Sequence, residues 1–236
     1  MGDELEVAKA AAARSAADRF VRPGLLLALG TGSTAALAVR AIHEQYPEEA
    51  FDCVASSRAT EELARSLGFK VRPLTADDRF DVMLDGADEV APSLDLTKGG
   101  GGALFREKFL ARLSVQLVIL VDPSKIVTAL GQRAAIPVET VPFAVPVLSR
   151  QLEDDGFDVR LRAGPDGHPF VTDNGNQIID LRPPSPVDDP GRLDDELRER
   201  PGVVETGLFV GLADRVLVGH PDGHVREMLA PAKRTE

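Results

Sequence analysis

Residues 25–35 are Leu-Leu-Leu-Ala-Leu-Gly-Thr-Gly-Ser-Thr-Ala: an apolar run, a glycine turn and the start of a helical segment that continues to about Tyr46. A short continuous apolar run is typical of a buried parallel strand. A glycine turn between a strand and a helix offers free N–H groups at the positive end of the helix dipole, where anions bind. The stretch therefore predicts an α/β fold with a phosphate site after this strand.

The same turn fits the G-x-G-x-x-A pattern of dinucleotide-binding folds, which leaves alternatives open. That pattern needs a carboxylate after the second strand, but the next strand candidate, residues 51–55, is followed by Ser56, Ser57 and Arg58. Arg58 keeps an NADP-dependent reductase among the alternatives, and a simple Ser/Thr helix cap is another. A compact phosphate monoester is favoured because the turn carries three hydroxyls that can donate to phosphate oxygens. They belong to Thr31, Ser33 and Thr34.

A second glycine-rich stretch, Lys98-Gly-Gly-Gly-Gly-Ala-Leu-Phe-Arg-Glu-Lys108, also runs into a segment of good helix formers. Its glycines let the backbone approach a ligand closely. Lys98 precedes the loop and Glu107 lies one turn into the helix, so an anion site, a cation and a carboxylate lie close together in sequence. This arrangement indicates chemistry on a small anionic substrate. The alternative is a flexible linker before an ordinary amphipathic helix.

Charged groups follow two further predicted strands. Asp85-Gly-Ala-Asp-Glu89 ends the strand of residues 81–85, and Asp122-Pro-Ser-Lys125 ends the strand of residues 115–121. In open α/β sheets ligands bind beyond the carboxyl ends of the strands. Asp85 and Asp88 are therefore candidates for acid/base work or for a magnesium site, with a solvated turn as the alternative.

Composition and charge limit the partners of the chain. The net charge of −11 disfavours general binding to nucleic acid or acidic membranes. The single cysteine, Cys53, excludes an internal disulfide and a cysteine-based metal cluster. The N-terminus does not have the pattern of a signal peptide, and no apolar run approaches the roughly 20 residues that span a membrane. We expect a cytoplasmic protein with neither a nucleic-acid nor a membrane partner.

The order of segments predicts a Rossmann-like, doubly wound, mainly parallel sheet with a second, smaller α+β lobe. We expect residues 1–130 plus 206–236 to form the large domain and residues 131–205 the small one, with a helix over residues 3–20. Asn174-Gly175 predicts a hairpin turn in the small lobe. Its expected strands are residues 159–162, 170–172 and 177–181. Residues 207–211 and 215–219 are expected to rejoin the first sheet.

Together these motifs resemble ribose-5-phosphate isomerase of the A type, in the order and spacing of that family. They are Gly30-Thr-Gly-Ser-Thr34, Ser57-Arg-Ala-Thr60, Asp85-Gly-Ala-Asp-Glu89, Lys98-Gly-Gly-Gly, Arg106-Glu-Lys108, Asp122-Pro-Ser-Lys125, Pro137-Val-Glu139, Thr172-Asp-Asn-Gly-Asn176 and Pro201-Gly-Val-Val-Glu205-Thr-Gly-Leu-Phe209. Phe105 departs from the smaller or polar residue often found there. The N-terminal lysine of the family corresponds loosely to Lys9, to which we assign no role.

The resemblance implies interconversion of D-ribose 5-phosphate and D-ribulose 5-phosphate, in the non-oxidative branch of the pentose phosphate pathway, with no redox cofactor and no obligatory metal. It implies that Glu107 is the base that moves a proton between C2 and C1. Lys98 and the glycine N–H groups would stabilise the ene-diolate, and Asp85 and Asp88 would handle ring opening and hydroxyl protons. A sugar-phosphate sensor without turnover is the alternative, because fold alone does not establish activity.

The resemblance also implies the substrate contacts and the assembly. The contacts are Thr31, Gly32, Ser33, Thr34, Asp85, Gly86, Ala87, Asp88, Lys98, Gly99, Gly100, Gly101 and Lys125. The expected partners are the sugar phosphate and further copies of the chain, as a homodimer or a dimer of dimers, with the small lobe as the oligomerisation lobe.

Overall fold

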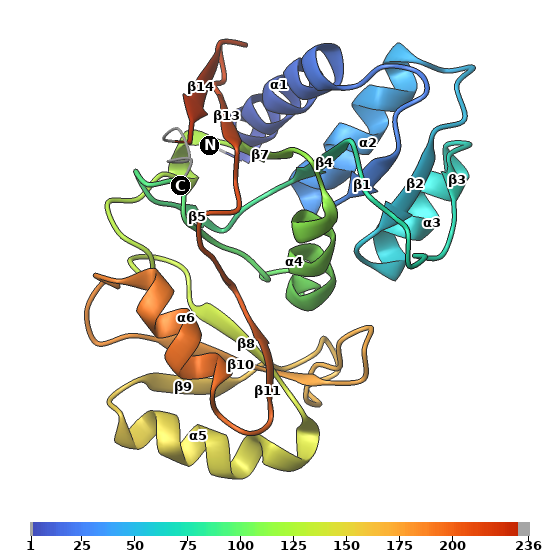
Figure 1. Cartoon of the computed structure of the whole chain (residues 1–236). Coiled ribbons are helices and arrows are strands. Elements are labelled where there is room, and N and C mark those ends of the chain that lie inside the picture. Colours follow the sequence, from blue (N-terminus) through green and yellow to red (C-terminus); the bar gives the residue numbers. More distant parts are fainter. Residues whose placement is uncertain (1, 231–236) are drawn as a thin grey trace, which may run out of the picture.

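A seven-stranded sheet forms the centre of the larger part of the molecule (Figure 1). The computed structural model describes residues 2–230, so residue 1 and residues 231–236 of the predicted large domain lie outside the described residues. The strands, in spatial order, are β14 (Val225–Leu229), β13 (Arg215–Gly219), β7 (Leu117–Val121), β4 (Val82–Asp85), β1 (Leu27–Leu29), β2 (Asp52–Ala55) and β3 (Lys70–Val71). Neighbouring strands are parallel except β13 and β14, which confirms the predicted fold class.

Helices cover both faces of this sheet, which explains why its central strands are continuous apolar runs. On one face lie α1 (Gly2–Phe20), α2 (Ser33–Gln45) and α3 (Arg58–Ser66), and on the other lies α4 (Leu104–Leu113). The alanines of α1 let the helix approach β13 closely: a Cβ on Gly219 would lie 2.0 Å from the carbonyl oxygen of Ala8. No helix within residues 2–230 is long and apolar enough to cross a membrane.

The direction of winding reverses between β1 and β4. The chain proceeds from β1 to β2 and β3 on one side, and to β4, β7 and β13 on the other. Such a switch point opens a crevice at the carboxyl ends of the two strands, where ligands bind. The two strands lie so close there that a Cβ on Gly30 would be 2.1 Å from Cγ of Asp85, so only glycine fits after β1.

The smaller part of the molecule is an antiparallel sheet with two helices (Figure 1). Its strands, in spatial order, are β11 (Val203–Thr206), β8 (Ile136–Thr140), β10 (Gln177–Arg182) and β9 (Asp158–Leu161). The helices are α5 (Val145–Asp154) and α6 (Pro190–Arg198). Apolar residues of both helices and of β8 and β10 form a third core cluster, which also includes Ala91, Val127, Leu130 and Leu208 from outside residues 131–205.

Two of the expected strands are wrong. Residues 170–172 form a loop, because Phe170 and Thr172 bond to Arg162 and Asn176 rather than along a strand ladder. Residues 207–211 contribute only β12 (Leu208–Phe209), which pairs with β6 (Leu96–Thr97) and not with the large sheet; β6 in turn pairs with β5 (Glu89–Val90). Residues 215–219 do rejoin the large sheet as predicted, as β13.

Just before β12, Gly207 packs closely between the backbones of Lys98 and Pro137. Lys98 donates its backbone N–H to the carbonyl oxygen of Gly207, and Gly207 donates its own to Pro137. A Cβ on Gly207 would lie 2.3 Å from the oxygen of Lys98. This crossing draws residues 207–209 toward the glycine loop and away from the large sheet.

Candidate active site

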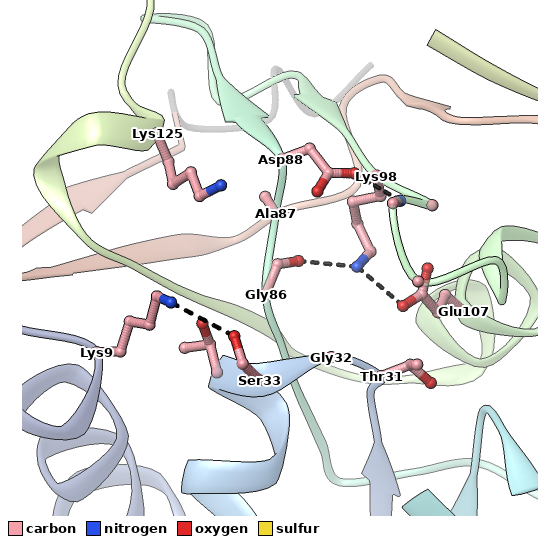
Figure 2. Close-up of a pocket in the computed structure, with 14 residues that line it drawn as sticks. Lys9, Thr31, Gly32, Ser33, Gly86, Ala87, Asp88, Lys98, Glu107 and Lys125 are labelled. Carbon is pink, nitrogen blue, oxygen red and sulfur yellow. Dashed lines mark hydrogen bonds and ion pairs between the residues drawn. The ribbon is translucent and has the colours of Figure 1, made fainter. Parts of the chain in front are cut away.

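An open cavity lies at the carboxyl ends of β1 and β4 (Figure 2). Its lining residues are Lys9, Thr31, Gly32, Ser33, Thr34, Gly86, Ala87, Asp88, Lys98, Gly99, Gly100, Gly101, Glu107 and Lys125. They come from α1, the turn before α2, the segment after β4, the glycine loop, α4 and the 3-10 helix η1 (Pro123–Lys125). The switch point thus brings together two motifs predicted as anion sites, the turn at Gly30–Thr34 and the glycine loop, and two charged motifs at strand ends, Asp85–Glu89 and Asp122–Lys125.

One end of the cavity is built around the start of α2. Gly32 occupies the N-cap with φ of 106°, and no described side chain caps the helix, so the interpretation of this turn as a Ser/Thr cap is wrong. The free N–H groups of the first turn therefore remain available to an anion. Lys9 Nζ lies 3.5 Å from Oγ of Ser33, and Figure 2 shows Lys9 and Lys125 at this end of the cavity, away from Glu107.

Lys98 connects the carboxylates at the other end. Its Nζ lies 2.9 Å from Oδ2 of Asp85 and 3.3 Å from Oε1 of Glu107, and it donates to the carbonyl oxygen of Gly86 at 2.8 Å (Figure 2). Burial disfavours the ammonium ion, but Asp85 and then Glu107 outweigh this effect and raise the pKa of Lys98. Lys98 therefore stays positively charged at neutral pH.

Glu107 is a buried carboxylate with one oxygen held and one oxygen free. Its side chain is 4% exposed, and its Oε2 has no hydrogen-bond partner among the described residues. Burial raises the pKa of Glu107 to about 8, against the opposing charge of Lys98, and the nearby Asp85 adds to the increase. A carboxylate with such a pKa is a much stronger base than an ordinary glutamate.

The two aspartates after β4 differ in position. Asp85 is fully buried and does not line the cavity; its Oδ1 accepts hydrogen bonds from the backbone N–H groups of Thr31 and Gly86. Burial raises its pKa against the charge of Lys98. Asp88 lines the cavity, and its Oδ2 accepts a hydrogen bond of 2.8 Å from the backbone N–H of Gly100. Of the two carboxylates in this motif, Asp85 is therefore buried outside the cavity lining, whereas Asp88 lies at the cavity surface.

The glycine loop requires glycine for two reasons. Gly99 and Gly102 have φ of 100° and 80°, a region that other residues seldom adopt. A Cβ on Gly100 would lie 2.7 Å from Oδ1 of Asp88. The loop is therefore a fixed turn against Asp88 rather than a flexible linker.

The residues suggested for a magnesium pair and for an NADP site are not arranged as those two alternatives need. Among residues 2–230 there is no group of three or more His, Cys, Asp or Glu residues that could hold a metal ion, and Asp85, half of the suggested magnesium pair, is already bound to Lys98 and two N–H groups. Arg58, which the NADP alternative needs, does not line the cavity and binds Asp173 through its backbone N–H.

A cavity with two lysines at one end and a buried carboxylate beside a third lysine at the other, on a doubly wound sheet, is typical of an α/β enzyme of small anionic substrates. The family model of ribose 5-phosphate isomerase A (phosphoriboisomerase A) matches residues 52–223. The chain is 48% identical over 220 residues to ribose-5-phosphate isomerase A of Thermomicrobium roseum, covering 92% of each chain, and 46% identical over 221 residues to that of Chloroflexus aurantiacus, with the same coverage. The chain belongs to the ribose-5-phosphate isomerase A family and is an aldose–ketose isomerase.

Solved structures of the family share the fold over almost the whole chain. Ribose 5-phosphate isomerase from Plasmodium falciparum matches with a TM-score of 0.90 at 32% identity, covering 95% of this chain and 99% of that one. A D-ribose-5-phosphate isomerase in complex with phospho-erythronic acid matches with a TM-score of 0.88 at 36% identity and the same coverage.

The cavity contains every predicted site residue except Asp85, and it adds Lys9. Lys9 had no predicted role because its correspondence to the N-terminal lysine of the family is loose, and no local pattern relates α1 to the turn before α2. Only the packing of α1 beside α2, which the long-range contacts record, places Lys9 near Ser33.

Proposed function

We propose that the chain interconverts D-ribose 5-phosphate and D-ribulose 5-phosphate through an ene-diolate, with Glu107 as the general base. The observation that supports this proposal is Oε2 of Glu107, which has no hydrogen-bond partner within residues 2–230 and is buried in the cavity beside a lysine that stays charged. A base needs a free oxygen, a suitable pKa and a nearby group that stabilises the charge it creates. Glu107 has all three.

The phosphate of the substrate binds at the end of the cavity with Lys9, Lys125 and the start of α2. Two ammonium groups and the uncapped N–H groups of a helix suit a dianion. Ser33 and Thr34 line the same end and can donate from their hydroxyls. An acidic protein thus presents a local positive pocket to its anionic substrate, and the opposite end of the cavity receives C1 and C2.

In the reaction Glu107 moves one proton from C2 to C1, while a second proton leaves O2 and an equivalent proton is added to O1. Glu107 takes the proton from C2 of the open-chain aldose, the C–H electron pair forms the C1–C2 double bond, and O1 becomes negatively charged. The charge is stabilised by Lys98 and the glycine N–H groups until O1 is protonated. Loss of the O2 proton forms the C2 carbonyl, and Glu107 returns its proton to C1. Two electrons move within one molecule, so no external oxidant or reductant is required.

The two aspartates have separate roles in this scheme. Asp88, at the cavity surface, accepts hydroxyl protons during ring opening and is held in place by Gly100. Asp85 acts through Lys98, whose ammonium it holds at 2.9 Å. Phospho-erythronic acid, found with a related isomerase, combines a phosphate with a carboxylate, which resembles the ene-diolate in charge, and we propose that it binds this cavity too.

The assembly and location follow the family resemblance. We propose a homodimer or a dimer of dimers in which the small lobe takes part, supported by the exposed apolar side chains of Phe143 and Val147, 95% and 62% exposed. We further propose a cytoplasmic enzyme of the pentose phosphate pathway that has no nucleic-acid or membrane partner, in keeping with its net charge of −11.

The test is isomerisation of D-ribose 5-phosphate in EDTA without added nucleotide, by the wild type, Glu107→Gln and the control Glu62→Gln. Glu62 is exposed on α3. We expect wild-type turnover, an unchanged control, and a loss of about 10²–10⁴ in kcat for Glu107→Gln, the usual contribution of a general base. If the wild type binds the sugar phosphate without turnover, the result supports a sugar-phosphate sensor. A near-normal kcat in Glu107→Gln would exclude Glu107 as the base.

A further inference from the structure

A side chain of the small lobe holds the backbone of the glycine loop. Arg162 follows β9, and its Nη1 donates to the carbonyl oxygen of Gly99 at 2.7 Å and to that of Gly100 at 3.1 Å. Arg162 does not line the cavity, so it acts on the loop from the side that faces the small lobe.

These two contacts determine where the loop's N–H groups point. In a trans peptide unit the C=O and the N–H point in opposite directions, and the described residues contain no cis peptide bond. Holding the oxygen of Gly99 therefore turns the N–H of Gly100 away from Arg162, toward Asp88, to which it donates at 2.8 Å. Holding the oxygen of Gly100 likewise turns the N–H of Gly101 away from Arg162, and Gly101 lines the cavity.

Arg162 is itself rigidly placed. Its Nε and Nη2 donate to the two carboxylate oxygens of Asp180 at 2.9 and 2.5 Å, and its side chain is 14% exposed. Its guanidinium also lies 6.0 Å from the ring centroid of Phe170, a ring whose atoms lie 2.5 Å from the position of a Cβ on Gly102. A bidentate pair of this kind fixes direction as well as distance.

The loop needs such a clamp because it has no side chains of its own. Four consecutive glycines have more conformational freedom to lose than any other sequence of that length. An oxyanion site stabilises charge only if its N–H groups are already oriented before the reaction. The two hydrogen bonds from Arg162 therefore restrict a loop whose own sequence permits many conformations.

We propose that Arg162, braced by Asp180, is a positioning residue that orients the N–H groups of Gly100 and Gly101 toward Asp88 and the ene-diolate oxygen. The proposal rests on the proposed function, since it needs an anionic intermediate at this loop. It makes the small lobe a working part of the active site: none of its described residues lines the cavity, yet Arg162 determines the geometry of glycines that do.

The experiment compares Arg162→Met, Arg162→Lys and Asp180→Asn with the control Arg160→Met. Arg160 lies two residues earlier on β9; its side chain is 75% exposed and binds only Asp158 among the described residues, although its backbone pairs with that of Asp180. For each variant we would measure kcat and KM, the affinity for phospho-erythronic acid, the affinity for inorganic phosphate, and the melting temperature.

For Arg162→Met we expect kcat to fall roughly 10- to 100-fold, somewhat less than the loss of a complete oxyanion donor, while KM changes less than about threefold. The affinity for phospho-erythronic acid should fall in parallel with kcat, whereas phosphate should bind as in the wild type, because it occupies the other end of the cavity. Arg162→Lys should recover part of kcat, Asp180→Asn should lie between wild type and Arg162→Met, and Arg160→Met should match the wild type.

A purely structural role would lower the melting temperature and leave kcat and the affinity for phospho-erythronic acid of the folded enzyme within about twofold of wild type; that result would overturn the proposal. If Arg162→Met does not fold, Arg162→Lys and Asp180→Asn decide by the same comparison. A failure of the proposed function would show in the wild type itself, as absent turnover, whereas a failure of this inference shows only among the variants.

Discussion

Oε1 of Glu107 lies 3.3 Å from Nζ of Lys98, while Oε2 of the same carboxylate has no hydrogen-bond partner among residues 2–230. The contact with Lys98 holds the carboxylate in place through Oε1, and Oε2 remains available to accept a proton. The lysine is in turn held by Asp85 at 2.9 Å. The predictions below follow from this arrangement of a base, a cation and a buried second carboxylate.

The rate should depend on the ionisation of Glu107. Because burial raises its pKa to about 8, most of the enzyme at lower pH carries a protonated Glu107, which cannot accept the C2 proton. We expect kcat/KM to rise with pH through an ionisation near 8 and then to level. A profile measured from about pH 5 to about pH 9.5 checks this; an ionisation near the ordinary glutamate value of 4.5 would contradict it.

Asp85→Asn should move that ionisation to lower pH. The negative charge of Asp85 raises the pKa of Glu107, so its removal favours the carboxylate of Glu107. The variant should also lose about tenfold or more in kcat, because Lys98 loses the partner that orients it. The exposed Asp77→Asn is the control. If the ionisation seen in the pH profile of kcat/KM stays at the same pH or moves to higher pH in Asp85→Asn, the charge of Asp85 does not raise the pKa of Glu107.

Glu107→Gln should stabilise the fold at high pH. A carboxyl whose folded pKa is raised binds its proton more tightly in the folded state, so its contribution to stability is present below the unfolded value of 4.5 and is lost as pH rises through about 8. The neutral amide avoids this loss. We expect its melting temperature to exceed that of the wild type by a few degrees near pH 9, with the difference shrinking toward pH 5, since about 1 kcal/mol shifts a domain of this size by roughly 2–4 °C. A difference that is independent of pH would refute the assignment of this pKa.

Lys125→Met and Lys9→Met should weaken phosphate recognition. Each removes a cation from the end of the cavity near Ser33, and a hydrogen bond to a charged group contributes about 1.5–3 kcal/mol. We expect KM for D-ribose 5-phosphate to rise roughly 10-fold or more, with a smaller change in kcat. The exposed Lys70→Met provides the control. If inorganic phosphate inhibits Lys125→Met as strongly as the wild type, the phosphate binds elsewhere.

The elements of the large sheet could be predicted because their signals are local. Residues 25–29 and 115–121 are mainly apolar runs long enough to indicate buried strands. The glycine turns at residues 30–34 and 99–102 each precede a helix, as predicted. The sheet of β5, β6 and β12 could not be predicted, because strands of two residues have no periodicity. Residues 207–209 depart from expectation only because Gly207 fits between Lys98 and Pro137.

Most residues of the site could be predicted from sequence motifs, but the burial of each side chain and the direction in which it points could not. Arg106, Glu107 and Lys108 are adjacent, and only the family resemblance selected Glu107. In the structure Arg106 bonds to Asn174, and Lys108 bonds to Glu205 at 2.7 Å, so the middle residue alone of the three lines the cavity. The burial of Asp85 and the hydrogen bonds from Arg162 to the glycine loop depend on packing between segments that are distant in sequence. Local sequence patterns cannot predict such packing.

The most direct measurement follows the C2 hydrogen itself. D-Ribose 5-phosphate carrying deuterium at C2 would be incubated in ordinary water with the wild type, Glu107→Gln and Glu62→Gln, and isomerisation and loss of deuterium from C2 would be followed together. Glu107 as the base predicts that both processes fall by about 10²–10⁴ in Glu107→Gln, while this variant still binds phospho-erythronic acid and Glu62→Gln behaves as the wild type. Loss of deuterium at the wild-type rate in Glu107→Gln would show that another group removes the proton.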